Sequence, residues 1–214
     1  MAATDRAEME IPGVSVVIPA YNYSRYLPEA IDSALNQSVP PGEVLVIDDG
    51  STDDTAEVVA ARYGQNPLVR YIYQANAGLS AARNTGVQNA RGEYIGFLDA
   101  DDQWKPDFIR EILGCFKRLP EKFALIAARS TIITSTGDLM PRKRLLEDTD
   151  RELSCADLIL KSRFSPSAAV CRRSVFSECG LFDTTLRSSE DRDMWIRIAA
   201  RHRVLLCGQQ LILF

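Results

Sequence analysis

Three aspartates that lie close together after an apolar stretch have the clearest chemical potential in this sequence. Residues 94–98 are apolar and rich in aromatic and aliphatic side chains, which predicts a strand buried on both faces of a sheet. Asp99, Asp101 and Asp102 follow it. Packing does not explain these negative charges, because like charges this close repel each other. A hard divalent cation with oxygen ligands would offset the repulsion at Asp99 and Asp101, whereas we expect Asp102 to cap the next helix.

Two further pairs of acidic residues stand at predicted element boundaries. Asp48 and Asp49 follow the second predicted strand, and Glu190 and Asp191 open a predicted helix. The carboxyl ends of parallel strands meet at one edge of a sheet, so Asp49 and Asp99 should line one crevice. From the residues alone, Asp48 suits a structural turn, and the Glu190–Asp191 pair also suits the positive start of a helix.

Strands and helices that alternate over the first 120 residues must position these carboxylates. Short apolar runs predict the strands, and apolar residues at helical spacing predict the helices. Pro19 is expected to end the first strand because it lacks a ladder donor, and Gly86 to interrupt the third helix softly. The alternation favours an α/β fold with a mostly parallel sheet flanked by helices. The predicted strands are 14–18, 43–47, 68–73 and 94–98, and the predicted helices are 25–37, 51–63 and 79–89.

The pattern changes after residue 120 and predicts a smaller antiparallel part. We expect residues 1–12 to form a flexible tail and residues 13–214 to form one domain. The last strand-like run ends without polar residues, which leaves open that the natural protein continues. The predicted elements are strands at 123–134, 168–171 and 211–214, a hairpin turn at 135–138, and helices at 153–161, at 173–179 and from about 188.

Composition and charge exclude several classes of protein. Hydrophobic residues make up 46% and charged residues 25%, which excludes a disordered chain. The net charge of −4 gives no long-range attraction to nucleic acid or to an anionic membrane. Five cysteines without a Cys-x-x-Cys pair suit neither a disulfide framework nor a zinc site, so we expect reduced thiols and a cytoplasmic protein. No apolar run approaches the roughly 18 residues of a transmembrane segment, so any contact with the inner face of the membrane would be peripheral.

Five stretches together resemble the family 2 glycosyltransferases of GT-A fold. Each is weak alone, but they follow one another at suitable spacing over nearly the whole chain. The resemblance implies a single Rossmann-like, mostly parallel sheet, with a nucleotide-binding half at 13–120 and an acceptor-binding half at 121–214. The stretches are VSVVIPAYN at 14–22, VIDDGSTD at 46–53, NAGLSAARN at 76–84, FLDADD at 97–102 and EDRDMW at 190–195.

The resemblance implies an inverting enzyme that moves one sugar from a nucleotide-diphospho-sugar, most simply a UDP-sugar, to a hydroxyl group. The acceptor would be a carbohydrate or a lipid-linked glycan in polysaccharide or cell-envelope synthesis, and the cofactor would be Mn²⁺ or Mg²⁺. Neither the Gln-x-x-Arg-Trp motif nor the membrane helices of processive synthases are present, which favours single-sugar transfer. The chain ends before the region where many members carry a further arginine and histidine close to the metal.

The matched stretches also imply roles for single residues around the nucleotide sugar. Asp49 would accept a hydrogen bond from the base, above a floor formed by Tyr21 and the backbone of Pro19 and Ala20. The remaining residues expected at the nucleotide sugar are Gly78, Arg83, Asp99 and Ala100, with Arg83 near the nucleotide or the phosphates.

The resemblance further implies a cation site and a general base. Asp101, with Asp99, would bind the cation that bridges the two phosphates. Asp191 would take the proton from the acceptor hydroxyl, and Glu190 would hold hydroxyl groups of the acceptor or donor. One base without a second carboxylate nucleophile predicts inversion at the anomeric carbon.

Other functions stay open at this point. A catalytically silent nucleotide-sugar-binding domain would show the same stretches. Asp99-Ala-Asp101 after an apolar strand also suits an aspartate-based phosphatase, although such enzymes usually carry this motif on their first strand. A dinucleotide oxidoreductase is disfavoured, because no Gly-x-Gly-x-x-Gly follows the first predicted strand.

Overall fold

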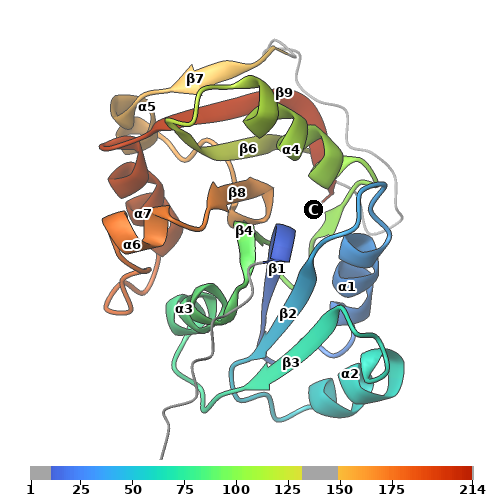
Figure 1. Ribbon diagram of the computed structural model, residues 1–214. Coiled ribbons are helices and arrows are strands. Elements are labelled where there is room, and N and C mark those ends of the chain that lie inside the picture. Colours follow the sequence, from blue (N-terminus) through green and yellow to red (C-terminus); the bar gives the residue numbers. More distant parts are fainter. Residues whose placement is uncertain (1–10, 132–148, 214) are drawn as a thin grey trace, which may run out of the picture.

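One mixed sheet carries helices on both faces (Figure 1). The computed structural model describes residues 11–131 and 149–213. The strands are β1 (Ile11–Ala20), β2 (Glu43–Asp48), β3 (Val69–Tyr73), β4 (Gly92–Phe97), β5 (Gln103–Trp104), β6 (Phe123–Thr131), β7 (Arg151–Leu153), β8 (Ala169–Arg172) and β9 (Arg203–Leu213). The helices are α1 (Leu27–Leu35), α2 (Thr55–Tyr63), α3 (Leu79–Asn89), α4 (Phe108–Arg118), α5 (Cys155–Leu160), α6 (Val175–Cys179), α7 (Glu190–Ala199) and the 3₁₀ helix η1 (Pro166–Ala168).

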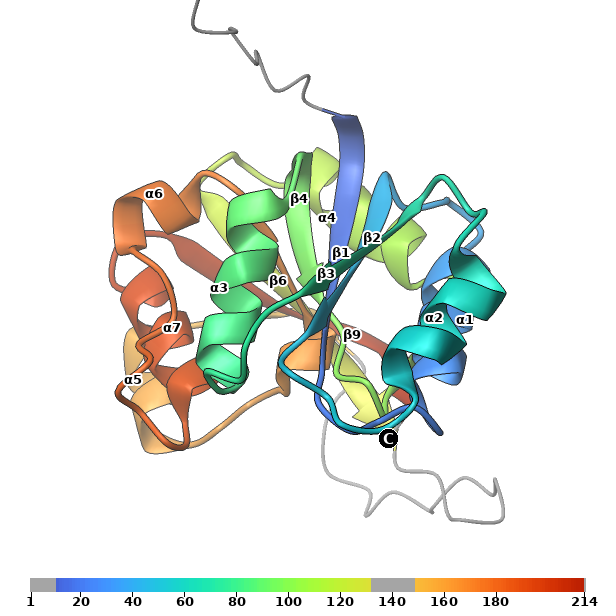
Figure 2. The ribbon, with the colours of Figure 1, turned by 90° about the horizontal axis from the view of Figure 1, so that it is seen from below.

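The amino-terminal half forms the parallel part of the sheet. Its strands lie in the order β3-β2-β1-β4, and all three neighbouring pairs are parallel. The chain steps from β1 out to β3 and then returns to β4, so α1 and α2 lie on one face and α3 on the other (Figure 2). This reversal places the carboxyl ends of β1, β2 and β4 around a crevice, as predicted for the carboxylates.

The carboxyl-terminal half extends the same sheet with antiparallel and parallel pairs. β8 lies between β4 and β6 and is antiparallel to both, whereas β9 runs parallel to β6 and pairs at its other edge with β5 and β7. The predicted α/β class with a mostly parallel sheet and some antiparallel strands is therefore confirmed. The predicted hairpin turn at 135–138 and residues 132–134 of the predicted strand lie outside the described residues.

An aromatic cluster joins the two halves on the face of the sheet that carries α3, α6 and α7. The Phe97 ring at the end of β4 lies 5.3 Å from the Phe182 ring and 6.1 Å from the Phe176 and Trp195 rings, between ring centroids. All four side chains are buried. Aromatic pairs at such distances add to the stability from burial, so α7 is fixed to the end of β4.

The predicted end of the first strand at Pro19 is wrong. Pro19 does not end β1, which pairs with β2 as far as Ala20. The Val17 carbonyl faces β4 and accepts from Leu98 N–H. The backbone nitrogen of Pro19, two residues later, faces the same side. Because β4 has ended at Phe97, no strand there requires the N–H that proline lacks. The amino-terminal prediction also changes, because Ile11 and Pro12 belong to β1, and residues 1–10 lie outside the described residues.

Gly86 does not interrupt α3, which continues through it to Asn89. A β-carbon at Gly86 would lie 2.2 Å from Val17 Cγ1, a side chain that is fully buried on β1. The glycine therefore serves the close approach of α3 to the sheet. This approach positions the residues at the start of α3 beside the crevice.

No helix in the described ranges, 11–131 and 149–213, has the length and apolar character that crossing a membrane requires.

Candidate active site

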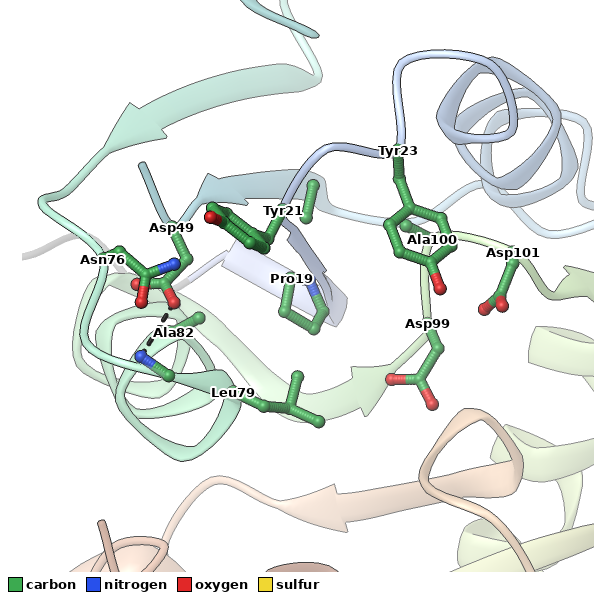
Figure 3. Close-up of a pocket in the computed structure, with 12 residues that line it drawn as sticks. Pro19, Tyr21, Tyr23, Asp49, Asn76, Leu79, Ala82, Asp99, Ala100 and Asp101 are labelled. Atoms are coloured by element: carbon green, nitrogen blue, oxygen red, sulfur yellow. Dashed lines mark hydrogen bonds between the residues drawn. The ribbon is translucent and has the colours of Figure 1, made fainter. Parts of the chain in front are cut away.

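A cavity of about 470 Å³ opens at the carboxyl ends of β1, β2 and β4, within the size range of small-molecule sites (Figure 3). Eight of the predicted site residues line it: Pro19, Ala20, Tyr21, Asp49, Gly78, Asp99, Ala100 and Asp101. Arg83, Glu190 and Asp191 do not line it. The structure adds four lining residues that sequence reasoning missed, Tyr23, Asn76, Leu79 and Ala82.

Asp49 lies at one end of the cavity and holds the loop between β3 and α3. Its Oδ1 accepts from Gln74 Nε2 at 2.7 Å and from Ala77 N–H at 2.9 Å, and its Oδ2 accepts from Gly78 N–H at 2.8 Å. The side chain is buried, so this carboxylate is fixed. A carboxylate accepts about four hydrogen bonds, so one position on Oδ2 is left for a donor in the cavity, such as the N–H of a base.

Asn22 organises the loop that follows β1. It adopts the left-handed conformation, with φ of 59°, and its Oδ1 accepts from Thr52 N–H at 2.7 Å and from Asp53 N–H at 3.3 Å. The predicted start of α2 at residue 51 or 52 is wrong for this reason, since these N–H groups bind Asn22 and the helix begins at Thr55. Asp48 is structural, because its carboxylate accepts from Ser51 N–H and from the Tyr71 hydroxyl.

Two tyrosines from the same loop form the upper wall of the cavity. Tyr21 lies between Asp49 and Pro19, and the Tyr23 hydroxyl points toward the end that carries Asp99 and Asp101 (Figure 3). The Asp101 carboxylate raises the pKa of the Tyr23 hydroxyl, and burial and Asp99 add to the rise. A single aromatic residue in a loop has no periodic signal, which is why sequence analysis missed Tyr23.

The acidic turn after β4 is anchored by a serine from a distant segment. Ser167, on η1, donates to the Asp102 carboxylate and accepts from Asp99 N–H at 3.0 Å. Burial raises the pKa of Asp102 to about 7, and the carboxylates of Asp99 and Asp101 act in the same direction. The prediction that Asp102 caps the following helix is wrong, because its carboxylate binds Ser167 and α4 begins only at Phe108.

Arg83 lies behind the cavity wall and connects Asp99, at the acidic end of the cavity, to Glu190 on α7. Its Nη2 lies 2.9 Å from Asp99 Oδ1, and its Nη1 lies 2.7 Å from Glu190 Oε1. The Arg83 side chain is 1% exposed, compared with 29% for Asp99 and 13% for Glu190. The predicted contact between Arg83 and a nucleotide therefore stays a prediction, and Arg83 forms ion pairs with the two carboxylates.

Asp191 follows Glu190 in the first turn of α7. Burial raises the pKa of its carboxyl group above the usual aspartate range, and the Glu190 carboxylate adds to the rise. Hydrogen bonds from backbone N–H groups and the charge of Arg83 act in the opposite direction. A carboxylate with a raised pKa is a stronger base than an exposed aspartate, which is the property that a general base requires.

The predicted cation ligands have suitable chemistry but are few. No group of three or more histidine, cysteine, aspartate or glutamate side chains in the described part of the chain could hold a metal ion. Asp99 keeps Oδ2 for a further ligand because Arg83 uses Oδ1, and Asp101 is exposed at the rim. One or two carboxylates completed by phosphate oxygens and water are a typical set for Mg²⁺, so these residues fit a divalent cation bound together with a diphosphate.

The chain belongs to glycosyl transferase family 2. The family model that carries this description matches residues 15–180, more than half of the chain. This range includes the cavity residues but ends before Glu190 and Asp191.

Individual relatives agree with this assignment. The chondroitin synthase of Escherichia coli is 46% identical over 108 residues, which are 50% of this chain and 16% of that protein. The hyaluronan synthase of Pasteurella multocida is 48% identical over 106 residues, which are 50% of this chain and 11% of that protein. An uncharacterized glycosyltransferase of Rickettsia bellii is 31% identical over 198 residues, which are 91% of this chain and 28% of that protein.

Solved structures confirm the fold. Residues 1–349 of S. aureus TarS in complex with UDP superpose with a TM-score of 0.76 over 94% of this chain and 60% of that chain, at 22% identity. The same fragment in complex with UDP-GlcNAc gives the same score. This chain therefore has the fold of TarS, and it spans less than two thirds of the length of each of these proteins.

Proposed function

We propose that this chain is the catalytic domain of an inverting glycosyltransferase that moves one sugar from a UDP-sugar to an acceptor hydroxyl. The observation that carries the proposal is the cavity itself. The buried carboxylate of Asp49 lies at one end, where it can bind the nucleobase. Asp99 and Asp101 lie at the other end, where they can bind a cation that accompanies the diphosphate. Membership of glycosyl transferase family 2 supports the reaction class. The UDP complexes of TarS support the choice of uridine, since the fold is shared.

The cavity residues suit the parts of a nucleotide sugar in order. Asp49 accepts the base N–H with the free position on Oδ2, while Tyr21 and the Pro19–Ala20 backbone hold the faces of the nucleoside. Gly78 lines the cavity at the Asp49 end and Ala100 at the end that carries Asp99 and Asp101, and the small size of both residues allows close approach of the donor. Asp101 and Oδ2 of Asp99 would hold Mn²⁺ or Mg²⁺, and such a cation would supply Lewis-acid stabilisation of the negative charge on the diphosphate.

Asp191 is proposed as the general base for the acceptor. Its raised pKa makes the carboxylate able to take the proton of a hydroxyl group, and Glu190 beside it accepts hydrogen bonds from sugar hydroxyls. The acceptor would bind over residues 121–214, outside the donor cavity. Relatives named as chondroitin and hyaluronan synthases support a carbohydrate acceptor in polysaccharide synthesis, and a lipid-linked glycan is an alternative acceptor.

The setting of the reaction is also proposed. The five cysteines are free thiols, which supports a reducing compartment such as the cytoplasm, where the chain would act at the inner face of the membrane. A catalytically silent binding domain remains the alternative, and the tests below separate the two. The aspartate-based phosphatase is disfavoured by the family assignment.

Calorimetry with UDP, with and without Mn²⁺, tests the donor site. Wild-type protein should bind UDP more tightly when Mn²⁺ is present, and D101N should lose this gain. D49N should weaken binding under both conditions. Absence of UDP binding at millimolar ligand would contradict the proposed function.

Release of UDP from a panel of UDP-sugars, with and without candidate acceptors, tests the activity. D191N should bind UDP with unchanged affinity and lose acceptor-dependent release, because the base does not line the donor cavity. Wild-type protein that binds UDP and a UDP-sugar but never releases UDP would identify a silent domain. Unchanged release by D191N would remove Asp191 as the base.

A further inference from the structure

Two consecutive side chains of α3 hold the segment that leads into α7. Asn84 Nδ2 donates to the Phe182 carbonyl at 2.9 Å, and Asn84 Oδ1 accepts from Phe182 N–H at 2.8 Å. Arg83, the preceding residue, binds Glu190, the first residue of α7, and also Asp99. The sequence distance from Arg83 to Glu190 is 107 residues, so this contact joins the two halves of the fold directly behind the donor cavity.

The Arg83 guanidinium group is buried and is shared between two carboxylates. The side chain is 1% exposed, its guanidinium carbon lies 5.8 Å from the centroid of the Phe182 ring, and its buried Nε has no hydrogen-bond partner among the described residues. Removing one member of a buried ion pair leaves an uncompensated charge, which is strongly unfavourable. Because one guanidinium group serves both carboxylates, a change in the charge of Asp99 alters the balance between its two ion pairs.

We propose that Arg83 is a positioning residue that couples occupancy of the donor site to the order of α7, which carries the base. The inference rests on the proposed function, since it requires a cation and a diphosphate at Asp99 and Asp101. When Asp99 shares its charge with a cation, Arg83 interacts more strongly with Glu190 and steadies the first turn of α7. Asp191 is then held in place only when a donor is present. While the donor site is empty, contact between Asp191 and an acceptor is disfavoured.

The side-chain type at position 83 makes the proposal specific. Nη1 and Nη2 of the planar guanidinium group bind different carboxylates at fixed separation. A lysine ammonium group keeps the charge but lacks the rigid fork that serves both partners. R83K should therefore preserve the net charge and the fold while weakening the coupling. E190Q tests the other end, since it keeps the shape of the side chain and removes its charge.

Hydrogen exchange of the amides at 193–199 of α7, with and without UDP and Mn²⁺, tests the coupling. In wild-type protein the ligands should slow this exchange by at least about fivefold, the lower end of the range for coupled sites. In E190Q and R83K the slowing should fall to less than half of the wild-type factor, while calorimetry still shows UDP binding. R110K is the matched control, because Arg110 on α4 forms ion pairs with Glu111 and with Asp107, the residue before the helix, and it should behave as wild type.

The outcomes separate this inference from the proposed function. Failure of the wild-type protein to bind UDP overturns the function and the coupling together. UDP binding by wild type without slowed exchange in α7, or with the same slowing in E190Q, overturns the coupling alone. If R83K does not fold, E190Q decides the question, because a glutamine at this partly exposed position leaves Arg83 paired with Asp99.

Discussion

Replacement of Gly86 by alanine should destabilise the protein, although alanine is the better helix former. The new β-carbon would lie 2.2, 2.9 and 3.1 Å from three carbons of the Val17 side chain, whereas carbon atoms in contact prefer separations of about 3.5–4.0 Å. Val17 is fully buried and β-branched, so it has no other rotamer to adopt at low cost. Overpacking of this kind costs about 1–3 kcal/mol, and we take about 3 kcal/mol because β1 lies inside the sheet. The helix-forming gain of about 1 kcal/mol leaves a net loss of about 2 kcal/mol.

Urea unfolding of two matched variants measures this effect. Gly114 lies inside α4, and a β-carbon there would meet no atom of the described residues within 4 Å apart from its chain neighbours and the adjacent backbone of its own helix. G114A should therefore gain up to about 1 kcal/mol, while G86A loses about 2 kcal/mol. The double variant G86A/V17A should lose at least about 1 kcal/mol less stability than the sum of the two single losses. The methyl group introduced at position 86 would then occupy the space left by the Val17 side chain. Equal stability changes in G86A and G114A would refute this account of how α3 approaches the sheet.

Three further predictions concern residues around the cavity. N22A should lower the free energy of unfolding in urea titrations by about 2 kcal/mol, because alanine is strained in the left-handed conformation and the hydrogen bonds of the Asn22 side chain are lost. N22G should lower it less, since glycine adopts this conformation without strain. Equal losses in N22A and N22G would show that backbone strain does not contribute. S167A should cost about 1–3 kcal/mol, because it leaves the buried Asp102 carboxyl group without its donor. S165A is its control, since that buried hydroxyl group has no hydrogen-bond partner in the described part of the chain, and a loss as large in S165A would contradict the assignment. The rate of sugar transfer should fall as the pH decreases through the pKa of Asp191, because the protonated carboxyl group cannot accept a proton. The fall should lie above the pKa of about 3.9 of an exposed aspartate. If the residual activity of D191N shows the same fall, Asp191 is not the general base.

The parallel half of the fold could be predicted because its signals are local. The second strand was expected at 43–47 and spans Glu43–Asp48, and the third helix was expected at 79–89 and spans Leu79–Asn89. Each is a continuous or periodic apolar pattern between clear breaks. Asp49, Asp99 and Asp101 could be placed at one crevice for a related reason, since strand-end residues of neighbouring parallel strands share one edge of the sheet.

The errors concern residues whose role depends on a neighbour far away in sequence. Gly86 was expected to weaken a helix, but its role depends on Val17, and Pro19 was expected to end a strand, but the result depends on where β4 stops. Asp102 binds Ser167, which is 65 residues away, so no local pattern indicates the pairing. The contacts of Arg83 with Glu190 belong to the same class.

The antiparallel pairing of β4 with β8 has a consequence for substrate entry and for engineering. Tyr94, Ile95 and Gly96 pair with Arg172, Cys171 and Val170, so backbone hydrogen bonds cross the boundary between the two halves. Opening the halves like two lobes would break this ladder, so we expect donor and acceptor to enter through movements of loops and side chains. A chimaera that exchanges the acceptor-side half would have to preserve the Ile95–Cys171 register, and its junction would lie at 119–122, between α4 and β6 and outside the cavity lining.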